Sequence, residues 1–373
     1  MIDLIALRYD LHRNPEIGLH LPRTAQTLAQ ILEQAGLQVT RDVGGSGFVA
    51  TLNAGAGKSA IALRADMDAL PIQEANDGPY KSKTDGLFHG CGHDGHSTML
   101  LGAALQLAMR TDLDRTVHFL FQADEETGHG AQAMIDDGLF DRFEIDQVFG
   151  MHNMPGMELG QFATQSGPFC AFEDNFDIHI TGIGGHASMP EAGIDPIVIG
   201  SQIVGQLQTI PSRAISAKDH AVVSVTEFNT DGARNILASN VHLMGDCRGF
   251  TDAVSAKIQT RMREIARGCA QAFGAKVNVD YSTSFRPLVN DAKATATAVA
   301  AAGSVGQVDA SYGRVGFSED FAAFLQHRPG NFILMGNGTD AANAWPLHNP
   351  QYDFNDNAMD VGINYWQTLA MTA

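Results

Sequence analysis

The sequence predicts an α/β protein: a mixed, mostly parallel sheet flanked by helices, with a smaller ferredoxin-like α+β domain inserted into it. Three observations carry this prediction. Strand and helix patterns alternate in the first part of the chain, a β-α-β-β-α-β order follows over about 110 residues, and helix and strand patterns resume after about Pro287. The length of 373 residues leaves room for two domains at about 150 residues each.

Hydrophobic periodicity and punctuating residues define the elements of the first part. A helix is expected over 22–35, because Pro22 lies near its start and Gly36 just past its end. The strand expected at 59–65 is nearly all apolar, as a strand buried on both faces is. The other expected strands are 47–53, 117–122 and 147–150, and the helices between them are 96–109 and 130–137. Strands and helices in alternation predict a mostly parallel sheet.

The pattern changes at about Phe172, where residues 176–180 alternate as a half-exposed strand does. The elements that follow are a helix at 195–207, strands at 221–228 and 241–247, a helix at 252–273 and a strand at 276–282. That order is the ferredoxin-like pattern. An Ala-rich helix at 292–302, a buried strand at 331–335 and a final helix at 355–369 complete the chain. We therefore predict a discontinuous larger domain, 1–171 and 285–373, interrupted by a smaller one at 172–284.

Composition excludes several classes of function. Lys and Arg number 24 against 42 Asp and Glu, a formal charge of −18, and no basic run occurs, so nucleic acid and anionic membranes are not expected partners. No apolar run reaches the ~18–20 residues of a membrane span. The acidic N-terminus lacks the pattern of a signal peptide, and the four cysteines lie too far apart for a disulfide framework. These features predict a soluble cytoplasmic protein.

Polar side chains follow three of the buried strands, where open α/β sheets bind ligands. Asp66 and Asp68 follow the second strand, Glu125 and Glu126 the third, and His152 the fourth. Two further segments add potential metal ligands: the run His89-Gly90-Cys91-Gly92-His93-Asp94-Gly95-His96 and the proline-bounded loop that contains His348.

Each of these features alone has an ordinary structural explanation. A lone histidine or acidic pair at a strand end is usually a cap or a solvated residue, and Cys91 with His93 fits a small buried thiol beside a helix start equally well. Together, a thiolate, imidazoles and carboxylates favour a divalent transition metal over Mg²⁺ or Ca²⁺. About five such ligands exceed what one catalytic zinc uses, which points to two ions that share ligands about 3.5–4 Å apart.

The sequence resembles the aminoacylase/carboxypeptidase family of dinuclear metallo-amidohydrolases, in its branch of hippurate hydrolase, N-acyl-L-amino-acid amidohydrolases and indoleacetyl-amino-acid hydrolases. The resemblance covers essentially the whole chain. The matching segments are 11–16 (LHRNPE), 62–71 (ALRADMDALP), 91–94 (CGHD), 122–130, 150–155, 184–187 (GGHA), 235–236 and 316–321 (GFSEDF). It implies a zinc-peptidase-like catalytic domain and an inserted lid or dimerisation domain.

The resemblance assigns roles to the residues that match. Cys91 would bridge two metal ions as thiolate, with Glu125 as general base and Asp66 as a carboxylate that orients a ligand. His93, Glu126, His152 and His348 would complete the metal sites. In the inserted domain, His186 and Asn235 would reach the active site of a partner subunit, and Arg248 would hold a substrate carboxylate. At position 64 the wider family has a metal-binding histidine, whereas this chain has arginine, so His93 would take over that duty.

The implied reaction is hydrolysis of an N-acyl amino acid, with an acetyl, benzoyl or similar acyl group, by a hydroxide held between two metal ions. Manganese or zinc is expected at the centre, with cobalt or nickel as alternatives. The resemblance also implies a homodimer, or a dimer of dimers, through the inserted domain. The alternatives are a dipeptidase, carboxypeptidase or aminobenzoyl-glutamate-type hydrolase on the same site, and a non-catalytic metal-stabilised binding protein. Retention of Glu125 argues against the last.

Other chemistries fit less well. The segment from Gly182 to Ala187 matches a dinucleotide-binding fingerprint, but Pro190 interrupts the required helix and no acidic residue follows about 20 residues on. The chain has no G-x-S-x-G or H-E-x-x-H motif. One departure from the family lies beside the expected base, where Asp124 replaces the usual alanine and adds negative charge.

Overall fold

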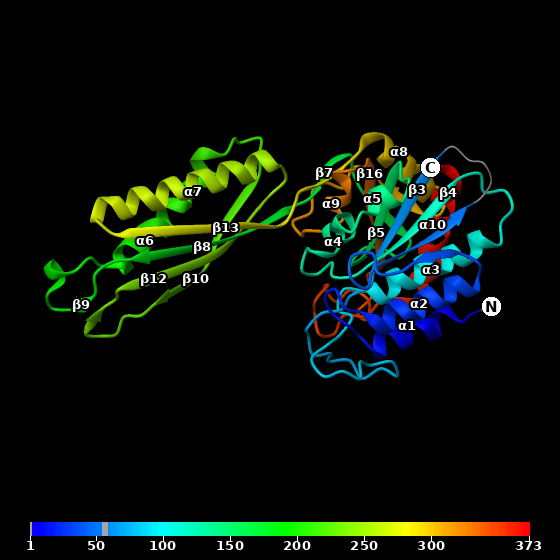
Figure 1. Cartoon of the computed structure of the whole chain (residues 1–373), viewed down its shortest axis with the longest axis horizontal. Helices are drawn as coiled ribbons and strands as arrows, with labels where there is room; N and C mark the ends of the chain where they lie inside the picture. The colour runs from blue at the N-terminus through cyan, green and yellow to red at the C-terminus, as the bar shows by residue number, and fades with distance from the viewer. Residues whose placement is uncertain (1, 54–58) are drawn as a thin grey trace. The chain divides into compact units, whose positions relative to one another are not determined.

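The computed structural model describes residues 2–53 and 59–373, which form two compact units. Unit 1 contains the described residues of Met1–Phe169, Val289–Arg314 and Glu319–Ala373, and unit 2 contains Cys170–Leu288 and Val315–Ser318. Figure 1 shows a large sheet in unit 1 and a smaller sheet in unit 2. None of the described helices is long and apolar enough to cross a membrane.

Unit 1 is built on an eight-stranded sheet with the order β1-β2-β4-β3-β5-β16-β6-β15. The strands are β1 (Gln38–Thr40), β2 (Phe48–Asn53), β3 (Ala60–Asp66), β4 (Thr116–Gln122), β5 (Gln147–Pro155), β6 (Gln161–Ala163), β15 (Gln307–Asp309) and β16 (Gly330–Gly338). The pairs β4–β3, β3–β5, β5–β16 and β6–β15 are parallel, whereas β1–β2, β2–β4 and β16–β6 are antiparallel. The prediction of a mixed, mostly parallel sheet is confirmed.

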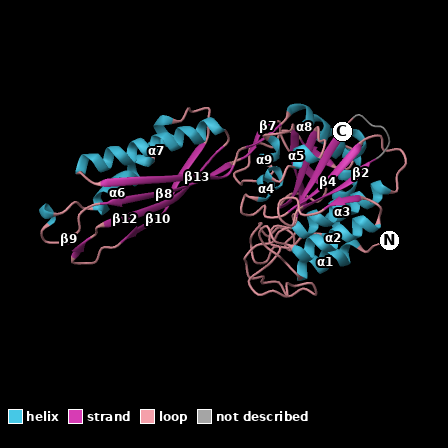
Figure 2. Ribbon diagram, viewed as in Figure 1, coloured by secondary structure: helices cyan, strands magenta, loops and turns pink. Residues whose placement is uncertain are grey.

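Helices flank this sheet (Figure 2). They are α1 (Leu4–Arg13), α2 (Pro22–Gln34), α3 (His93–Ala108), α4 (Gly130–Asp136), α5 (Leu139–Arg142), α8 (Ala292–Gly303), α9 (Ala322–Leu325), η3 (Asp356–Ala358) and α10 (Met359–Thr372). α10 packs against α3 and α8, and α1 packs against α3. Most of α3 is therefore buried, and its residues 99–105 are apolar on every face, as expected of a buried helix.

Unit 2 has a four-stranded antiparallel sheet with the order β10-β12-β8-β13. Its strands are β8 (Phe172–Thr181), β10 (Ala221–Thr230), β12 (Asn240–Gly249) and β13 (Lys276–Phe285), and its main helices are α6 (Pro196–Leu207) and α7 (Asp252–Phe273). Alternate residues of β8 are buried under α6 and α7, and the residues between them face away from the helices. The expected ferredoxin-like order is thus present.

Smaller elements complete unit 2 and the passages between the units. At the tip of unit 2 lie β9 (Gly185–His186), η1 (Pro190–Ala192) and β11 (Ile236–Leu237), and a π-helical turn, η2 (Ile210–Ala214), follows α6. The chain passes between the units at β7 (Gly167–Cys170) and β14 (Leu288–Asn290), and the segment Val315–Ser318 returns to unit 2.

Two boundaries differ from the sequence expectation in ways that bear on the site. The helix expected from residue 96 begins at His93, because Gly92 adopts a left-handed conformation (φ 87°) and starts α3 earlier. The strand expected to end at residue 150 continues to Pro155, because β16 pairs with it as far as that residue. His93 therefore lies on a helix, and His152 lies within a strand rather than beyond its end.

Candidate metal centre

Four segments of unit 1 bring the five expected metal ligands together. Cys91 precedes α3, and His93 is its first residue. Glu126 follows β4, His152 lies in β5, and His348 lies in a loop after β16. The ligand atoms of Cys91, His93 and His152 lie within 4.8 Å of one another, and so do those of Cys91, Glu126 and His348. The structure thus forms two overlapping groups of ligands that share the thiol of Cys91.

The turn before α3 requires a glycine. A Cβ atom on Gly92 would lie 2.3 Å from the hydroxyl oxygen of Tyr352 and 2.5 Å from the side-chain nitrogen of Asn153. That Asn153 nitrogen donates a hydrogen bond to the backbone oxygen of Cys91 at 2.7 Å. The close packing around Gly92 therefore fixes the backbone that carries the thiol.

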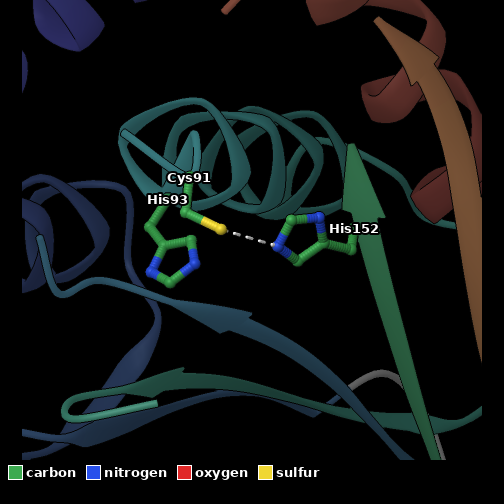
Figure 3. A group of neighbouring side chains, drawn as sticks. All are labelled: Cys91, His93 and His152. Carbon is green, nitrogen blue, oxygen red and sulfur yellow. Dashed lines mark hydrogen bonds between the residues drawn. The ribbon is translucent and has the colours of Figure 1, made fainter. Parts of the chain in front are cut away.

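The thiol of Cys91 points at His152, as Figure 3 shows, with 3.4 Å between Sγ and Nε2. Nδ1 of His152 lies 2.6 Å from the backbone oxygen of Asn153, so it carries the proton and leaves the lone pair of Nε2 toward the thiol. Burial, followed by the neighbouring His96, holds the pKa of His152 well below its usual value. A neutral imidazole with a fixed tautomer is the form that ligates a metal.

His93 is held by Asp68, a residue to which the sequence analysis assigned no role. Nδ1 of His93 lies 3.3 Å from Oδ1 of Asp68, and Oδ2 of Asp68 accepts a hydrogen bond from the backbone nitrogen of Glu126 at 3.1 Å. One carboxylate therefore positions two of the expected ligands. The sequence does show that two aspartates, Asp66 and Asp68, follow a strand. It does not show which of them contacts His93.

The other side of the His93 ring faces carboxylates without hydrogen-bonding them. Nε2 lies 3.7 Å from Oε1 of Glu126 and 3.8 Å from Oδ2 of Asp66. Both Nε2 of His93 and Oε1 of Glu126 are buried and have no hydrogen-bond partner among the described residues. Burial alone would lower the pKa of His93, but the carboxylates, led by Asp66 and Asp68, raise it to about 10. A buried imidazole nitrogen and a buried carboxylate oxygen that lie 3.7 Å apart without hydrogen bonds fit a cation between them.

The second group is completed by His348, whose Nε2 lies 3.4 Å from Oε2 of Glu126. Its backbone nitrogen donates to the oxygen of Gly90 at 2.8 Å, which ties the C-terminal loop to the segment before α3. The Cys91 thiol has its pKa raised well above the usual value by burial and by the carboxylates of Glu126 and Glu125. Ionising this thiol would require a cation beside it.

The chemistry of these residues fits metal ions. The buried thiol of Cys91, the neutral imidazole of His152, the imidazole nitrogen of His93 that has no hydrogen-bond partner and the carboxylate of Glu126 form a ligand set for divalent transition metals. Because Cys91 belongs to both groups, the set can hold two ions with a shared ligand. The centre accommodates two divalent metal ions.

Glu125, the expected base, has a carboxylate oxygen within 4.8 Å of ligand atoms of His93 and Glu126. Its side chain is buried, and its Oε1 accepts a weak contact from the backbone nitrogen of Asp320 at 3.5 Å. Burial and the carboxylates of Glu319 and Glu126 raise its pKa well above the usual value. The preceding residue, Asp124, has φ 59°, a left-handed conformation that aspartate tolerates better than most residues.

Behind the centre, Asp66 is in hydrogen-bond contact with His96 and Arg64, and its distance of 3.8 Å from Nε2 of the expected ligand His93 is too long for a hydrogen bond. Its Oδ1 lies 2.7 Å from Nδ1 of His96, and its Oδ2 accepts from Nη1 of Arg64 at 2.7 Å. The other nitrogen of His96 accepts from the backbone nitrogen of Asn153 at 3.0 Å. Both ring nitrogens of His96 are therefore engaged, which makes it a support for the centre and not a free ligand.

Arg64 also extends this support toward the base. Its guanidinium bonds Gln122 at 2.8 Å, Asp320 at 2.9 Å and Glu319 at 3.0 Å, and it is fully buried. An arginine that neutralises buried carboxylates stabilises their ionised forms. The positive charge of Arg64 balances the carboxylates of Glu319 and Asp66.

The three remaining expected site residues lie in unit 2. His186 in β9 pairs with Ile236 in β11, and the backbone oxygen of Asn235 accepts from the nitrogen of Ala187 at 3.2 Å, so His186 and Asn235 are neighbours. Nδ1 of His186 accepts a hydrogen bond from the backbone nitrogen of Ser188 at 3.2 Å. In the neutral ring the proton then resides on Nε2, which is free to donate.

Arg248 in β12 is already paired with protein carboxylates. Its Nη2 lies 2.7 Å from Glu173, its Nε lies 3.0 Å from Asp246, and its Nη1 donates to Ser318 at 2.6 Å. A substrate carboxylate would have to compete with Glu173 and Asp246 for the guanidinium.

Known proteins share this sequence and fold. The family described as Peptidase family M20/M25/M40 matches residues 62–372. The chain is 35% identical over 368 residues to a hippurate hydrolase of Campylobacter jejuni, covering 98% of this chain and 95% of the relative. It is 34% identical over 371 residues to an N-acetylcysteine deacetylase of Bacillus subtilis, covering 99% and 96%.

A solved structure with a similar fold also belongs to this family. The Bacillus subtilis YxeP protein, described as a dinuclear metal binding peptidase from the M20 family, superposes with a TM-score of 0.86 at 31% identity, covering 99% of this chain and 96% of that one. The family resemblance inferred from the motifs is confirmed. The chain belongs to peptidase family M20/M25/M40.

Proposed function

We propose that this protein is a metal-dependent amidohydrolase that cleaves the amide bond of N-acyl amino acids and releases a carboxylate and a free amino acid. The observation that carries the proposal is the buried ligand cluster around Cys91 with the carboxylate of Glu125 beside it. Relatives that match nearly the whole chain are named for hippurate and N-acetylcysteine, which are both N-acyl amino acids. This substrate class fits a site whose chemistry is hydrolysis of a linear amide.

The residues that would hold the metal ions are those of the two overlapping groups: Cys91, His93, Glu126, His152 and His348. Divalent ions bound there would lower the pKa of water toward about 7 and would stabilise negative charge on the substrate oxygen. Manganese or zinc is the expected metal. The thiol of Cys91 favours zinc, because thiolates bind softer ions more strongly.

Glu125 would move the protons of the reaction. Amide hydrolysis needs a base for the attacking water and an acid for the departing nitrogen, and one carboxyl group can serve both steps in turn. Burial beside Glu319 and Glu126 raises the pKa of Glu125, which favours holding a proton between the two steps. Arg64 opposes that rise and would keep Glu125 able to ionise.

Asp66 would act through its neighbours and not on the substrate. Its contacts to His96 and Arg64 link the strand that ends in Asp66 to the helix that begins at His93. We therefore assign it a positioning role. Asp68, which contacts His93 directly, would orient that ligand.

Unit 2 would supply groups that recognise the substrate. His186, with Nδ1 occupied by Ser188, would donate from Nε2 to the carbonyl oxygen as negative charge develops on it. Asn235 lies beside it on the paired segment and would add a further hydrogen bond. Arg248 would bind the carboxylate of the amino acid.

We further propose that unit 2, residues 172–284 in the sequence analysis, is a dimerisation domain between the two catalytic segments 1–171 and 285–373. Among the described strands, β10 is an edge strand of its sheet, and it exposes Val222 and Phe228. The adjacent helix α6 exposes Ile197 and Val198. An apolar edge of this kind is a liability in a monomer and a natural site for pairing with a second copy.

A substrate panel tests the proposed activity. The purified protein is stripped of metal with a chelator, reloaded with Mn²⁺, Zn²⁺, Co²⁺ or Ni²⁺, and assayed on N-acetyl and N-benzoyl amino acids, dipeptides and aminobenzoyl-glutamate. We expect no activity without metal and the highest kcat/KM on N-acyl amino acids. Preference for dipeptides or aminobenzoyl-glutamate would replace the proposed substrate class, and absence of turnover with every metal would leave the binding-protein alternative.

Mixing two inactive variants tests whether active sites are shared between subunits. A His186→Ala chain and a Glu125→Gln chain are each expected to be inactive alone. In a two-fold dimer with shared sites, one site of each mixed dimer is complete, so equal mixing should restore about a quarter of wild-type activity. The control is a mixture of His186→Ala with Asn235→Ala, which carry their defects on the same unit and should restore no activity. Lack of recovery in the first mixture would show that His186 does not act in a partner's site.

A further inference from the structure

A second cluster of potential metal ligands lies on unit 2, outside the centre described above. On the face of the sheet that points away from α6 and α7, β8 presents Asp177 and His179, and the neighbouring β12 presents His242. The antiparallel register places His242 directly opposite His179. On the other side of β8, Asp280 of β13 lies opposite Asp177. The sheet itself therefore gathers two imidazoles and two carboxylates from three strands.

The side chains of this cluster converge. The rings of His179 and His242 are stacked, with centroids 4.2 Å apart and 18° between their planes. Nε2 of His242 lies 2.6 Å from Oδ1 of Asp177, and Nε2 of His179 lies 3.8 Å from Oδ2 of Asp280. Ligand atoms of Asp177, His179 and His242 all lie within 4.8 Å of one another. Small side-chain rotations would bring them to the ~2.0–2.2 Å bonds of a zinc ion.

A simple ion pair explains only part of this arrangement. It accounts for His242 and Asp177, which are in hydrogen-bond contact. It leaves His179 stacked on His242 with its own Nε2 outside hydrogen-bond distance of Asp280, although the ring is about half exposed and free to turn toward water. Two imidazole nitrogens and a carboxylate oxygen within 4.8 Å of one another are a ligand set suited to a transition-metal ion and differ from the all-oxygen sets of Ca²⁺ and Mg²⁺.

We propose that Asp177, His179 and His242 form a binding site for a divalent transition metal such as Zn²⁺ on the open face of the unit 2 sheet, with Asp280 as a nearby carboxylate. The site is separate from the metal centre, because its ligands come from β8 and β12 and none comes from unit 1. A metal ion bound there links adjacent strands and stabilises their register. The exposed position, with water able to complete the coordination, predicts weaker binding than at the buried centre.

Zn²⁺ titration of the holoenzyme tests the proposal. The full chain with its metal centre loaded is titrated with Zn²⁺ alone by calorimetry in a non-chelating buffer. We expect one Zn²⁺ bound per chain beyond those of the centre. His242→Gln and His179→Gln should each weaken this binding by at least about tenfold, because each removes one of two imidazole ligands. The matched control is His220→Gln, an exposed histidine of the same unit at the opposite end of the sheet, which should bind Zn²⁺ as the wild type does.

Chemical labelling provides a second measurement that does not depend on activity or on total metal content. Diethyl pyrocarbonate modifies accessible imidazoles, and peptide mass spectrometry reports each histidine separately. Zn²⁺ should protect His179 and His242 together and leave His220 equally reactive. The proposal is overturned if the three single variants bind Zn²⁺ alike, or if Zn²⁺ leaves the labelling of His179 and His242 unchanged while circular dichroism shows all proteins folded.

Discussion

The two units each carry a cluster of imidazoles and carboxylates, and the two clusters are held by opposite means. In unit 1, Cys91, His93 and His152 are buried, and neighbours such as Asp68 and Asn153 fix their orientation. In unit 2, His179 and His242 are partly exposed, strand register places them side by side, and of the two only His242 is in hydrogen-bond contact with a carboxylate of the cluster, that of Asp177. Similar ligands therefore acquire different properties from their surroundings.

Burial is the main cause of that difference. In unit 1 it lowers the pKa of His152 and raises those of Cys91 and Glu125, so the charges of the cluster depend strongly on one another. An unpaired buried charge costs several kcal/mol, whereas water screens an exposed one. Substitutions in unit 1 should therefore have large and coupled effects, and those in unit 2 small and local ones.

The largest expected effect is on catalysis at Glu125. Glu125→Gln keeps the size and the hydrogen-bonding capacity of the side chain but cannot accept a proton. We expect kcat to fall by about 10²–10⁴-fold, the usual contribution of general acid–base catalysis. Metal content, measured by mass spectrometry of the intact holoenzyme, should stay at the wild-type value, because Glu125 is not among the proposed ligands. Turnover close to wild type would remove Glu125 from the mechanism.

Much of the fold could be predicted from local sequence. The alternating strands of unit 1 and the ferredoxin-like order of unit 2 follow from hydrophobic periodicity, which is a local property. The end of β5 could not be predicted, because its last residues pair with β16, about 180 residues later, and only that partner extends the strand past His152. The short strands β1, β6, β7, β9, β11, β14 and β15 were also missed, since segments of two to four residues give too little pattern to detect.

The ligands of the centre could be proposed from sequence because cysteine, histidine and glutamate at strand ends are unusual together. The residues that position these ligands could not be predicted from sequence. Asp66 and Asp68 are equivalent in sequence, and only the folded backbone shows that Asp68 contacts His93 while Asp66 contacts His96. The pairing of His179 with His242 also depends on register between strands about 60 residues apart. Contacts across a sheet are a tertiary property, which a single sequence does not display.

A second large effect is expected in the stability of unit 1 at high pH. His12 lies between Asp94, 2.9 Å away, and Glu74, 3.3 Å away. Burial opposes its protonation, but these carboxylates raise its pKa to about 9. A pKa above the unfolded value of about 6.5 stabilises the fold fully below pH 6.5, and this stabilisation is lost as pH rises through 9. The loss should be roughly 3 kcal/mol.

Urea unfolding at pH 6 and pH 9.5 measures this loss, followed by tryptophan fluorescence, because both tryptophans, Trp345 and the buried Trp366, lie in unit 1. His12→Gln should abolish the His12 contribution to the pH dependence. His327→Gln, at an exposed position of the same unit, should retain the wild-type dependence. Equal pH dependence in the wild type and the His12→Gln variant would contradict the assignment of a charged His12.

A smaller effect is expected when the support of a metal ligand is removed. Asp68→Asn weakens the hydrogen bond that orients His93 and removes a negative charge from the centre. We expect metal affinity to fall by about 10–100-fold, as for other carboxylates that orient ligand histidines. Competition with a chromogenic chelator measures it, and Asp85→Asn, an exposed substitution in the same unit, is the control. Unchanged affinity would mean that His93 is held without Asp68.

The smallest effect is expected for the exposed cluster of unit 2 in the absence of added metal. Asp177→Asn weakens the pair with His242, whose side chains are 42% and 32% exposed. Exposed pairs of this kind contribute about 0–1 kcal/mol, so the free energy of unfolding of the metal-free unit should change by no more than that. The same substitution should reduce the stabilisation that Zn²⁺ gives, because stabilisation of the folded state by a bound metal grows with the logarithm of its affinity. A large loss of stability without metal would show that this cluster is a structural ion pair, and the contrast between a buried and an exposed cluster would then fail.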